Sequence, residues 1–245
     1  MKADLAWKSI FDPMIRRRAL GYVRRKLGLY GNTSYAQSGE DIILRHLFDI
    51  IGVAVPSYLD IGANHPAHLS NSYLFYRQGS RGVCIEPDPA LVAAFKRKRP
   101  RDTVLGVGVA NQPGELEFFV MSVSSLNTFS AEEARHSETL GHRIEKCLKI
   151  PVITVNEALK QCNPIPDFVS IDVEGLDEAV VSGIDFGRFR PAAFCVETLT
   201  YEQHGGGEKK KNIFEIFSKN GFFPYADTYI NTIFVEENYW KKQKR

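Results

Sequence analysis

Apolar and polar positions alternate along this chain in a pattern that predicts strands and helices in turn. Short apolar runs, typical of buried strands, are separated by stretches whose apolar residues recur at three- and four-residue spacing, as in helices. The predicted strands are 57–61, 82–86, 103–109, 116–121, 150–155, 167–171, 192–197, 222–225 and 232–235. The predicted helices are 42–51, 69–78, 89–99, 156–162, 178–182 and 209–219, the first preceded by Ser38-x-x-Asp41, which has the form of a capping box.

The order of these elements indicates an α/β fold. Strands that alternate with helices form a mostly parallel sheet with helices on both faces and right-handed crossovers. The last two strands are expected to pair antiparallel. Residues 122–149 are polar and only weakly periodic, so they are expected to form either a lid or substrate loop, or a surface helical excursion. Residues 1–33 are expected to be a basic arm ahead of a domain of residues 34–245.

The charge distribution adds an expectation about the ends of the chain. The net charge is only +2, but basic residues crowd both termini. The arm could contact an anionic membrane surface, dock on the domain or on a second subunit in a homo-oligomer, or be a solvated tail. No apolar run reaches transmembrane length, and the first residues lack the apolar stretch and small-residue cleavage site expected of a secretory signal. The cysteine spacing does not suit metal ligands. We therefore expect a cytoplasmic protein, with the inner face of a membrane as an alternative location.

Chemistry-bearing residues follow the first two strands of the predicted sheet. The first strand runs into Asp60-Ile61-Gly62-Ala63-Asn64, and the second into Glu86-Pro87-Asp88. Ligands of open parallel sheets bind at the carboxyl ends of the strands, where a glycine permits close backbone approach. Glu86 follows Gly62 at roughly the spacing of about 20 residues at which an acidic residue binds ribose hydroxyls. The alternative for Asp60 and Gly62 is a tight strand-to-helix turn.

The glycine pattern indicates which nucleoside binds. A dinucleotide site needs G-x-G-x-x-G, but Asn64 and Ala67 stand at the second and third glycine positions, and Pro66 removes a backbone donor. S-adenosylmethionine contains adenosine without phosphate, and its cationic sulfonium favours acidic neighbours such as Asp60. We therefore expect S-adenosylmethionine as the cofactor. An NAD-linked oxidoreductase and a non-catalytic scaffold remain the alternatives.

Acidic residues also follow later strands. Asp172 and Glu174 come directly after strand 167–171, and such neighbouring carboxylates need a cation or a proton between them. They are the candidates for acceptor binding and proton removal, although helix capping by Asp172 or Asp177 is an alternative. His68 is a second candidate base, or a structural histidine. Asp172, Glu197 and His204 could hold a divalent cation, but their spacing does not require one.

Together these motifs resemble the FkbM family of methyltransferases from about residue 34 to residue 235. The resemblance is carried by Ser34-Tyr35-Ala36-Gln37-Ser38-Gly39-Glu40-Asp41, Asp60-Ile61-Gly62-Ala63-Asn64-His65-Pro66, Leu69-Ser70-Asn71-Ser72-Tyr73-Leu74-Phe75-Tyr76, Ile85-Glu86-Pro87-Asp88, Leu126-Asn127-Thr128-Phe129, Ser170-Ile171-Asp172-Val173-Glu174-Gly175 and Val196-Glu197. His65-Pro66 stand where many members have a glycine-containing loop.

The resemblance implies a class I methyltransferase fold, Rossmann-like, with a mostly parallel seven-stranded sheet, helices on both faces and a C-terminal antiparallel strand pair. It implies S-adenosylmethionine-dependent O-methylation of sugars, glycans or natural products, and no nucleic-acid partner is expected. Asp172 and Glu174 match the motif beside the transferred methyl. The residues that match cofactor-site motifs, or a segment folding over the cofactor, are Gln37, Glu40, Asp60, Gly62, Ala63, Asn64, Ser70, Glu86, Asp88 and Asp172.

Overall fold

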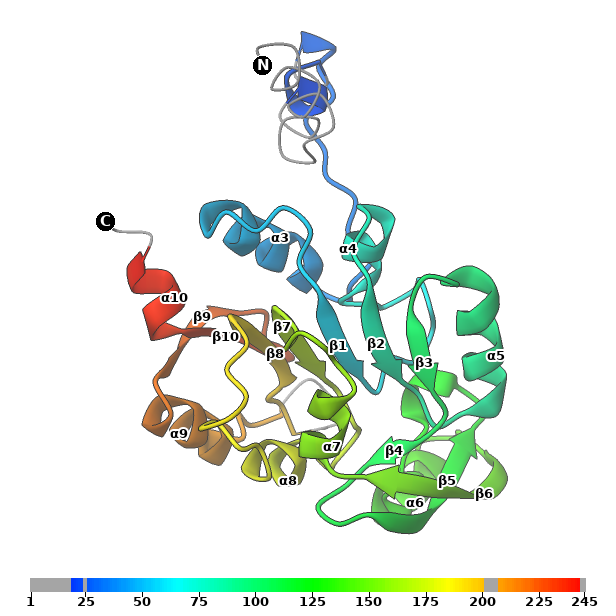
Figure 1. Cartoon of the computed structure of the whole chain (residues 1–245). Helices are drawn as coiled ribbons and strands as arrows, with labels where there is room; N and C mark the ends of the chain where they lie inside the picture. The colour runs from blue at the N-terminus through cyan, green and yellow to red at the C-terminus, as the bar shows by residue number, and fades with distance from the viewer. Residues whose placement is uncertain (1–18, 24–25, 201–206, 243–245) are drawn as a thin grey trace.

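A computed structural model of the chain describes residues 19–23, 26–200 and 207–242 (Figure 1). Its centre is a seven-stranded sheet in the order β3-β2-β1-β7-β8-β10-β9. The strands are β1 (Tyr58–Ile61), β2 (Gly82–Ile85), β3 (Thr103–Leu105), β7 (Phe168–Ile171), β8 (Ala193–Glu197), β9 (Phe222–Asp227) and β10 (Asn231–Glu236). The first five are parallel, and β10 runs antiparallel to both β8 and β9. The predicted fold class is confirmed.

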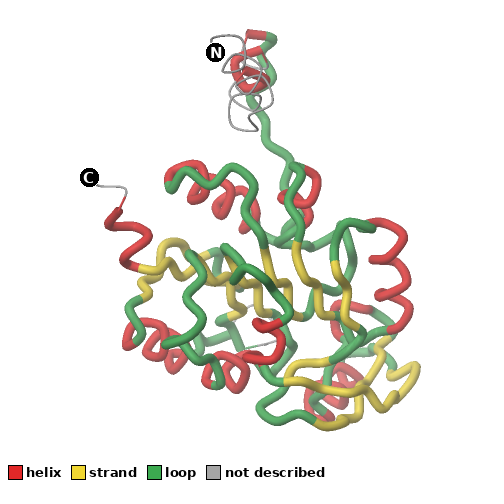
Figure 2. The backbone as a smooth tube through the Cα atoms, viewed as in Figure 1, coloured by secondary structure: helices red, strands yellow, loops and turns green. Residues whose placement is uncertain are grey.

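Helices cover both faces of this sheet (Figures 1 and 2). One face packs against α3 (Glu40–Ile50), α4 (Tyr73–Arg77) and α5 (Pro89–Lys98). The other packs against α7 (Val155–Lys160), α8 (Asp177–Ser182) and α9 (Lys211–Lys219). The short helix α10 (Glu237–Lys242) follows β10. Each face has its own apolar core, because side chains along a strand point alternately to opposite faces.

Strand β1 illustrates this alternation. Leu59 and Ile61 belong to the core beneath α7–α9, whereas Tyr58 belongs to the core beneath α3–α5. Asp60 points to the same face as Tyr58, where it accepts a hydrogen bond from the Ser72 hydroxyl just before α4. The face to which each β1 side chain points therefore decides what it can contact.

A second, smaller sheet lies beside the main one, and the region 122–149 predicted as a lid or surface excursion forms the connection between two of its strands together with the first residues of the second. Its order is β4-β6-β5, with β4 (Gly108–Val109), β5 (Gly114–Met121) and β6 (Ile144–Ile153). Helix α6 (Ala131–Thr139) and the 3-10 turn η1 (Ser124–Leu126) connect β5 to β6. The predicted single strand 103–109 is thus two strands in different sheets, separated at Gly106 and Val107.

Two helix starts differ from the prediction. Helix α3 has Gly39 at its N-cap with φ +91° and no side-chain cap. The Asp41 carboxylate instead accepts from the Ser34 hydroxyl and the Tyr35 N–H, so the predicted capping box is wrong. Helix α4 begins only at Tyr73, because Leu69 has a left-handed backbone with φ +52° that a helix cannot include.

The described part of the basic arm is helical at 19–23 and then leads to the domain (Figure 1). Its apolar side chains Leu20, Tyr22 and Leu27 are exposed. All five of its arginines lie outside the described residues, so its contact with a membrane or a second subunit stays a prediction. None of the described helices is both long and apolar enough to span a bilayer.

Candidate functional site

A cavity of about 390 Å³ lies at the carboxyl ends of β1, β2, β7 and β8. This is the edge of the sheet where ligands of open α/β folds bind. The predicted site residues that line it are Gln37, Gly62, Asn64, Glu86, Asp172, Glu174 and Glu197. The fold therefore brings residues from four strand ends and from the segment before α3 to one place.

The turn after β1 is built around Gly62. The N–H groups of Gly62 and Ala63 both donate to the Ile85 carbonyl at 3.0 Å, which ties this turn to the end of β2. Gly62 has φ +76°, and a Cβ there would lie 1.7 Å from the carbonyl oxygen of Asp172. Only glycine combines this left-handed backbone with such a close approach. The chain therefore makes a tight turn at Gly62, and this turn forms part of the cavity wall.

Glu86 joins the loops that follow β1 and β2. One of its carboxylate oxygens accepts from the Asn64 N–H at 2.7 Å, and the other accepts from the Asp88 N–H at 2.8 Å. Burial raises the pKa of Glu86 to about 8, although these two hydrogen bonds favour the ionised form. A carboxylate oxygen accepts more than one hydrogen bond, so Glu86 can still bind hydroxyl groups in the cavity.

Residues 124–129, here called the strap, cross the loops that follow three strands. The Asn64 side chain donates to the Ser124 carbonyl at 2.8 Å, and the Asn127 side chain donates to the Asp88 carboxylate at 3.3 Å. The Thr128 hydroxyl donates to the Glu174 carbonyl at 3.0 Å. All six strap residues line the cavity. The strap therefore fastens the loops after β1, β2 and β7 to one another.

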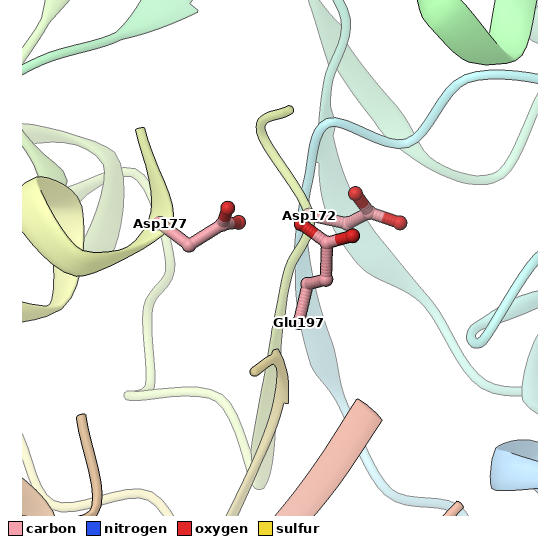
Figure 3. A group of neighbouring side chains, drawn as sticks. All are labelled: Asp172, Asp177 and Glu197. Atoms are coloured by element: carbon pink, nitrogen blue, oxygen red, sulfur yellow. The ribbon is translucent and has the colours of Figure 1, made fainter. Parts of the chain in front are cut away.

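Three carboxylates gather at the other end of the cavity, where β7 and β8 finish (Figure 3). Asp172, Asp177 and Glu197 each place one oxygen within 4.8 Å of the others. The Lys210 ammonium lies 3.0 Å from Asp177 and 3.5 Å from Glu197. Asp177 also accepts from the Val173 N–H at 2.9 Å, and Leu176 is the N-cap of α8 with no side-chain cap bond. Neither Asp172 nor Asp177 therefore serves as the N-cap of α8.

The carboxyl groups at this end hold their protons more strongly than ordinary ones. Burial raises the pKa of Asp172, Glu174 and Glu197, and the neighbouring carboxylates raise each of them further. Lys210 acts in the opposite direction on all three, but a single ammonium cannot offset the whole group. The site is therefore acidic and holds exchangeable protons.

The arrangement gives no support for the divalent cation considered from the sequence. Among the described residues, the third acidic side chain near Asp172 and Glu197 is Asp177. The Lys210 ammonium already supplies a positive charge to Asp177 and Glu197, so the cluster does not need a metal ion to balance these two carboxylates. His204 lies outside the described residues.

Several predicted cofactor residues do not line the cavity but support its walls. Asp60 is buried on the α3–α5 face, beneath Ser72 and the buried Arg99, and burial raises its pKa. Ser70 lies near the same guanidinium, at 3.4 Å. Ala63 is part of the same apolar core.

Three further predicted residues also lie outside the lining. Asp88 is the N-cap of α5 and accepts from the Ala90 N–H at 2.8 Å. Glu40 is buried and accepts from Thr228 at 2.6 Å and Asn231 at 3.0 Å, which ties α3 to the β9–β10 hairpin. His68 is exposed, and its N–H donates to His65 Nδ1 at 2.9 Å.

Backbone strain also concentrates at this cavity. The described non-glycine residues with positive φ are Asn64, Leu69, Glu174 and Tyr229, and all of them line it. Such conformations cost roughly 1–3 kcal/mol each and gather at ligand sites, where the surrounding structure holds them in place. Leu69 lies in one of the FkbM-like motifs without having been a candidate site residue, and nothing in the sequence pattern pointed to Tyr229.

The family model described as "Methyltransferase FkbM domain" matches residues 60–224. The chain belongs to the FkbM methyltransferase family. The FkbM assignment expected from the sequence is confirmed, and so is the class I methyltransferase fold. Methyltransferases of this family and fold use S-adenosylmethionine. A comparison with curated proteins gives no significant match.

Solved structures similar to this FkbM chain are distant. An O-methyltransferase from Bacillus cereus in complex with SAH shares 12% identity over 89% of this chain and 88% of its own, with a TM-score of 0.42. CalS10, an SAM-bound amino pentose methyltransferase of calicheamicin biosynthesis from Micromonospora echinaspora, shares 10% identity over 89% and 96%, with a TM-score of 0.41. At this distance the family match carries the identification.

Proposed function

We propose that this FkbM chain is an S-adenosylmethionine-dependent O-methyltransferase that acts on a hydroxyl of a sugar, glycan or natural-product acceptor. The observation that carries the proposal is one continuous cavity. Its lining runs from Glu86 after β2, past the Gly62 turn, to Asp172, Glu174 and Glu197 after β7 and β8. This order matches a bound nucleoside at one end and a reacting acceptor at the other.

The residues present fit a cationic, phosphate-free nucleoside. Four carboxyl groups line the cavity, and none of the described lining residues is lysine, arginine or histidine. A pyrophosphate would meet no positive side chain there, whereas a sulfonium and an ammonium would be attracted. These charges favour the methyl donor over NAD. Glu86 would bind the ribose hydroxyls, and Gly62, Asn64 and Gln37 would lie around the methionine end.

S-adenosylmethionine supplies an electrophilic methyl carbon on a positively charged sulfur. In the proposed reaction the acceptor oxygen forms a bond to this carbon as the carbon–sulfur bond breaks and its electron pair stays on sulfur. Asp172 takes the proton from the acceptor hydroxyl. Its raised pKa makes it a stronger base than an ordinary carboxylate, and a well-placed general base contributes roughly 10²–10⁴-fold. Glu174 lies beside it as the second candidate.

The predicted residues outside the cavity have supporting roles in this proposal. Glu40 would hold α3 against the β9–β10 hairpin, Asp88 would hold the strap through Asn127, and Asp60 and Ser70 would stabilise the turn after β1 through Ser72 and Arg99. His68 is not among the described residues that line the cavity, so we assign proton removal to the carboxylates.

Two measurements on the purified protein test the proposal. Calorimetry with S-adenosylhomocysteine and, separately, with NAD should give heat only with the first. Incubation with the radiolabelled methyl donor and fractionated cell extract should then label at least one carbohydrate or natural-product fraction, and Asp172→Asn should abolish this labelling. Heat with NAD alone would overturn the assignment of the cofactor. Tight binding of S-adenosylhomocysteine with no labelled fraction would instead identify a non-catalytic scaffold.

A further inference from the structure

We infer that the acceptor is an uncharged ring whose flat apolar face stacks on Tyr229. This inference rests on the proposed function and names the kind of acceptor that the site takes. Two independent features carry it, the charges that line the cavity and the way the fold presents one exposed aromatic side chain at the acceptor end.

The first feature is the sign of the charges at the acceptor end. Asp172, Glu174 and Glu197 line the cavity there, and no described lining residue is basic. Of the lysines that follow, Lys210 is paired with Asp177 and Glu197, and Lys209 is paired with Asp227. A phosphate or carboxylate buried there would find no cation among the described lining residues, and burying an unpaired anion is costly. A cationic acceptor would have to lie beside the sulfonium, which already carries the positive charge that this site attracts. An uncharged acceptor avoids both costs.

The second feature is the position of Tyr229 in the turn between β9 and β10. Its backbone is left-handed, with φ +76°, and is held on both sides. Its N–H donates to the Asp227 carboxylate at 2.7 Å, and its carbonyl accepts from the Lys209 ammonium. The turn is therefore rigid, yet the Tyr229 residue is 51% exposed and lines the cavity. Exposed aromatic rings on rigid backbone bind flat apolar surfaces at little cost in conformational entropy.

Leu69 is a second apolar residue that lines the cavity. Leu69, in the loop after β1, is also left-handed with φ +52°, and it is 43% exposed although it is apolar. Strained backbone that presents an apolar side chain to an open cavity is costly for an isolated protein and is retained where a ligand uses it. Exposed apolar side chains of this kind suit a ring with apolar C–H faces and with hydroxyls at its edge. Gln37 and Thr200 line the cavity too and offer uncharged partners for those hydroxyls.

The charge of the labelled product tests the first part of the inference. After reaction with the radiolabelled methyl donor, the labelled ring is released without acid, so that any phosphate, carboxylate or N-acetyl group stays in place, and is passed over anion- and cation-exchange resins. We expect the label in the flow-through of both. Retention on either resin would overturn the inference while leaving the proposed methyl transfer intact, because any labelled product already supports that function.

Variants of Tyr229 test the second part. Tyr229→Ala should raise the KM for the label-accepting fraction at least tenfold, whereas Tyr229→Phe, which keeps the ring, should stay within about threefold of the wild type. The dissociation constant of S-adenosylhomocysteine should change less than twofold in both variants. Tyr239→Ala, at a tyrosine of α10 that is 40% exposed, is the matched control. An unchanged KM in Tyr229→Ala, or equal losses in the Ala and Phe variants, would rule out stacking.

Discussion

Gly62 and Asp172 lie back to back, so close that a Cβ on Gly62 would come within 1.7 Å of the Asp172 carbonyl oxygen. The contact is backbone to backbone, and the Asp172 N–H also donates to the Ile61 carbonyl at 3.0 Å. The turn expected to hold the cofactor and the loop that carries the proposed base are therefore one rigid unit. Any displacement of one must move the other.

Gly62→Ala should disrupt this unit. The substitution places a methyl group against a carbonyl that cannot move aside, in addition to the left-handed strain of about 1–2 kcal/mol for any L-residue. Gly52→Ala is the control, because Gly52 has the same φ of +76° but no atom within 4 Å of its added Cβ. We expect Gly62→Ala to lower the melting temperature more than Gly52→Ala and to weaken S-adenosylhomocysteine binding at least tenfold. Similar effects of both variants would mean that the contact is unimportant.

Asp172→Asn should separate chemistry from binding. The amide keeps the shape of the side chain but cannot take a proton, so kcat should fall by roughly 10²–10⁴-fold. The S-adenosylhomocysteine dissociation constant, measured by calorimetry, should change less than threefold. Glu132→Gln, at an exposed position of α6, serves as the control. Equal losses of turnover and affinity would make Asp172 a cofactor ligand or a fold residue rather than a base.

Asn127→Ala should loosen the strap and weaken cofactor binding. The Asn127 side chain accepts from the Met121 N–H at 2.8 Å and donates to Asp88 at 3.3 Å. Because a hydrogen bond to a charged group contributes about 1.5–3 kcal/mol, we expect roughly a tenfold loss of S-adenosylhomocysteine affinity. Asn212→Ala removes a comparable amide–carboxylate bond, to Glu178 on the surface, and should leave affinity unchanged. Equal affinities of the two variants would show that the strap does not shape the site.

The acidic cluster should make stability fall as pH rises. A carboxyl whose pKa is raised by folding keeps a proton that the unfolded chain releases at about pH 4. The folded state then binds more protons, so the free energy of unfolding decreases with pH until the folded group also ionises. We expect the melting temperature of the ligand-free protein to drop from pH 6 to pH 8.5, and Glu197→Gln to reduce that drop. Glu215→Gln changes an exposed carboxylate of α9 that pairs with Lys219, and it should leave the drop in melting temperature unchanged. A slope unchanged by Glu197→Gln would contradict this account.

The sheet and the acidic residues at its edge could be predicted because the signals are local. The strands that end before Gly62, Glu86 and Asp172 are short buried apolar runs, and the residue following such a run must lie at the carboxyl edge of the sheet. Glu197, the last residue of β8, reaches the same edge for the same reason.

What the sequence could not provide depends on contacts between distant segments. The strap shows no periodicity, because its conformation is set by Asn64, Asp88 and Glu174. The sequence around Asp177 suggested a helix cap, because the ion pair that Asp177 forms with the distant Lys210 leaves no local signal. The position of Asp60 outside the cavity lining could have been predicted. The period-two alternation of β1 already places Asp60 on the face opposite Leu59 and Ile61, away from the core beneath α7–α9.

The acidic lining also bears on product inhibition. When the methyl group leaves, the donor's sulfur changes from a cation to a neutral thioether, while the cluster gains the proton released by the acceptor. Both changes remove attraction between the cavity and the spent nucleoside. The cavity should therefore bind the spent nucleoside less tightly than the donor, so the affinity measured for S-adenosylhomocysteine sets a lower bound on the affinity for the methyl donor.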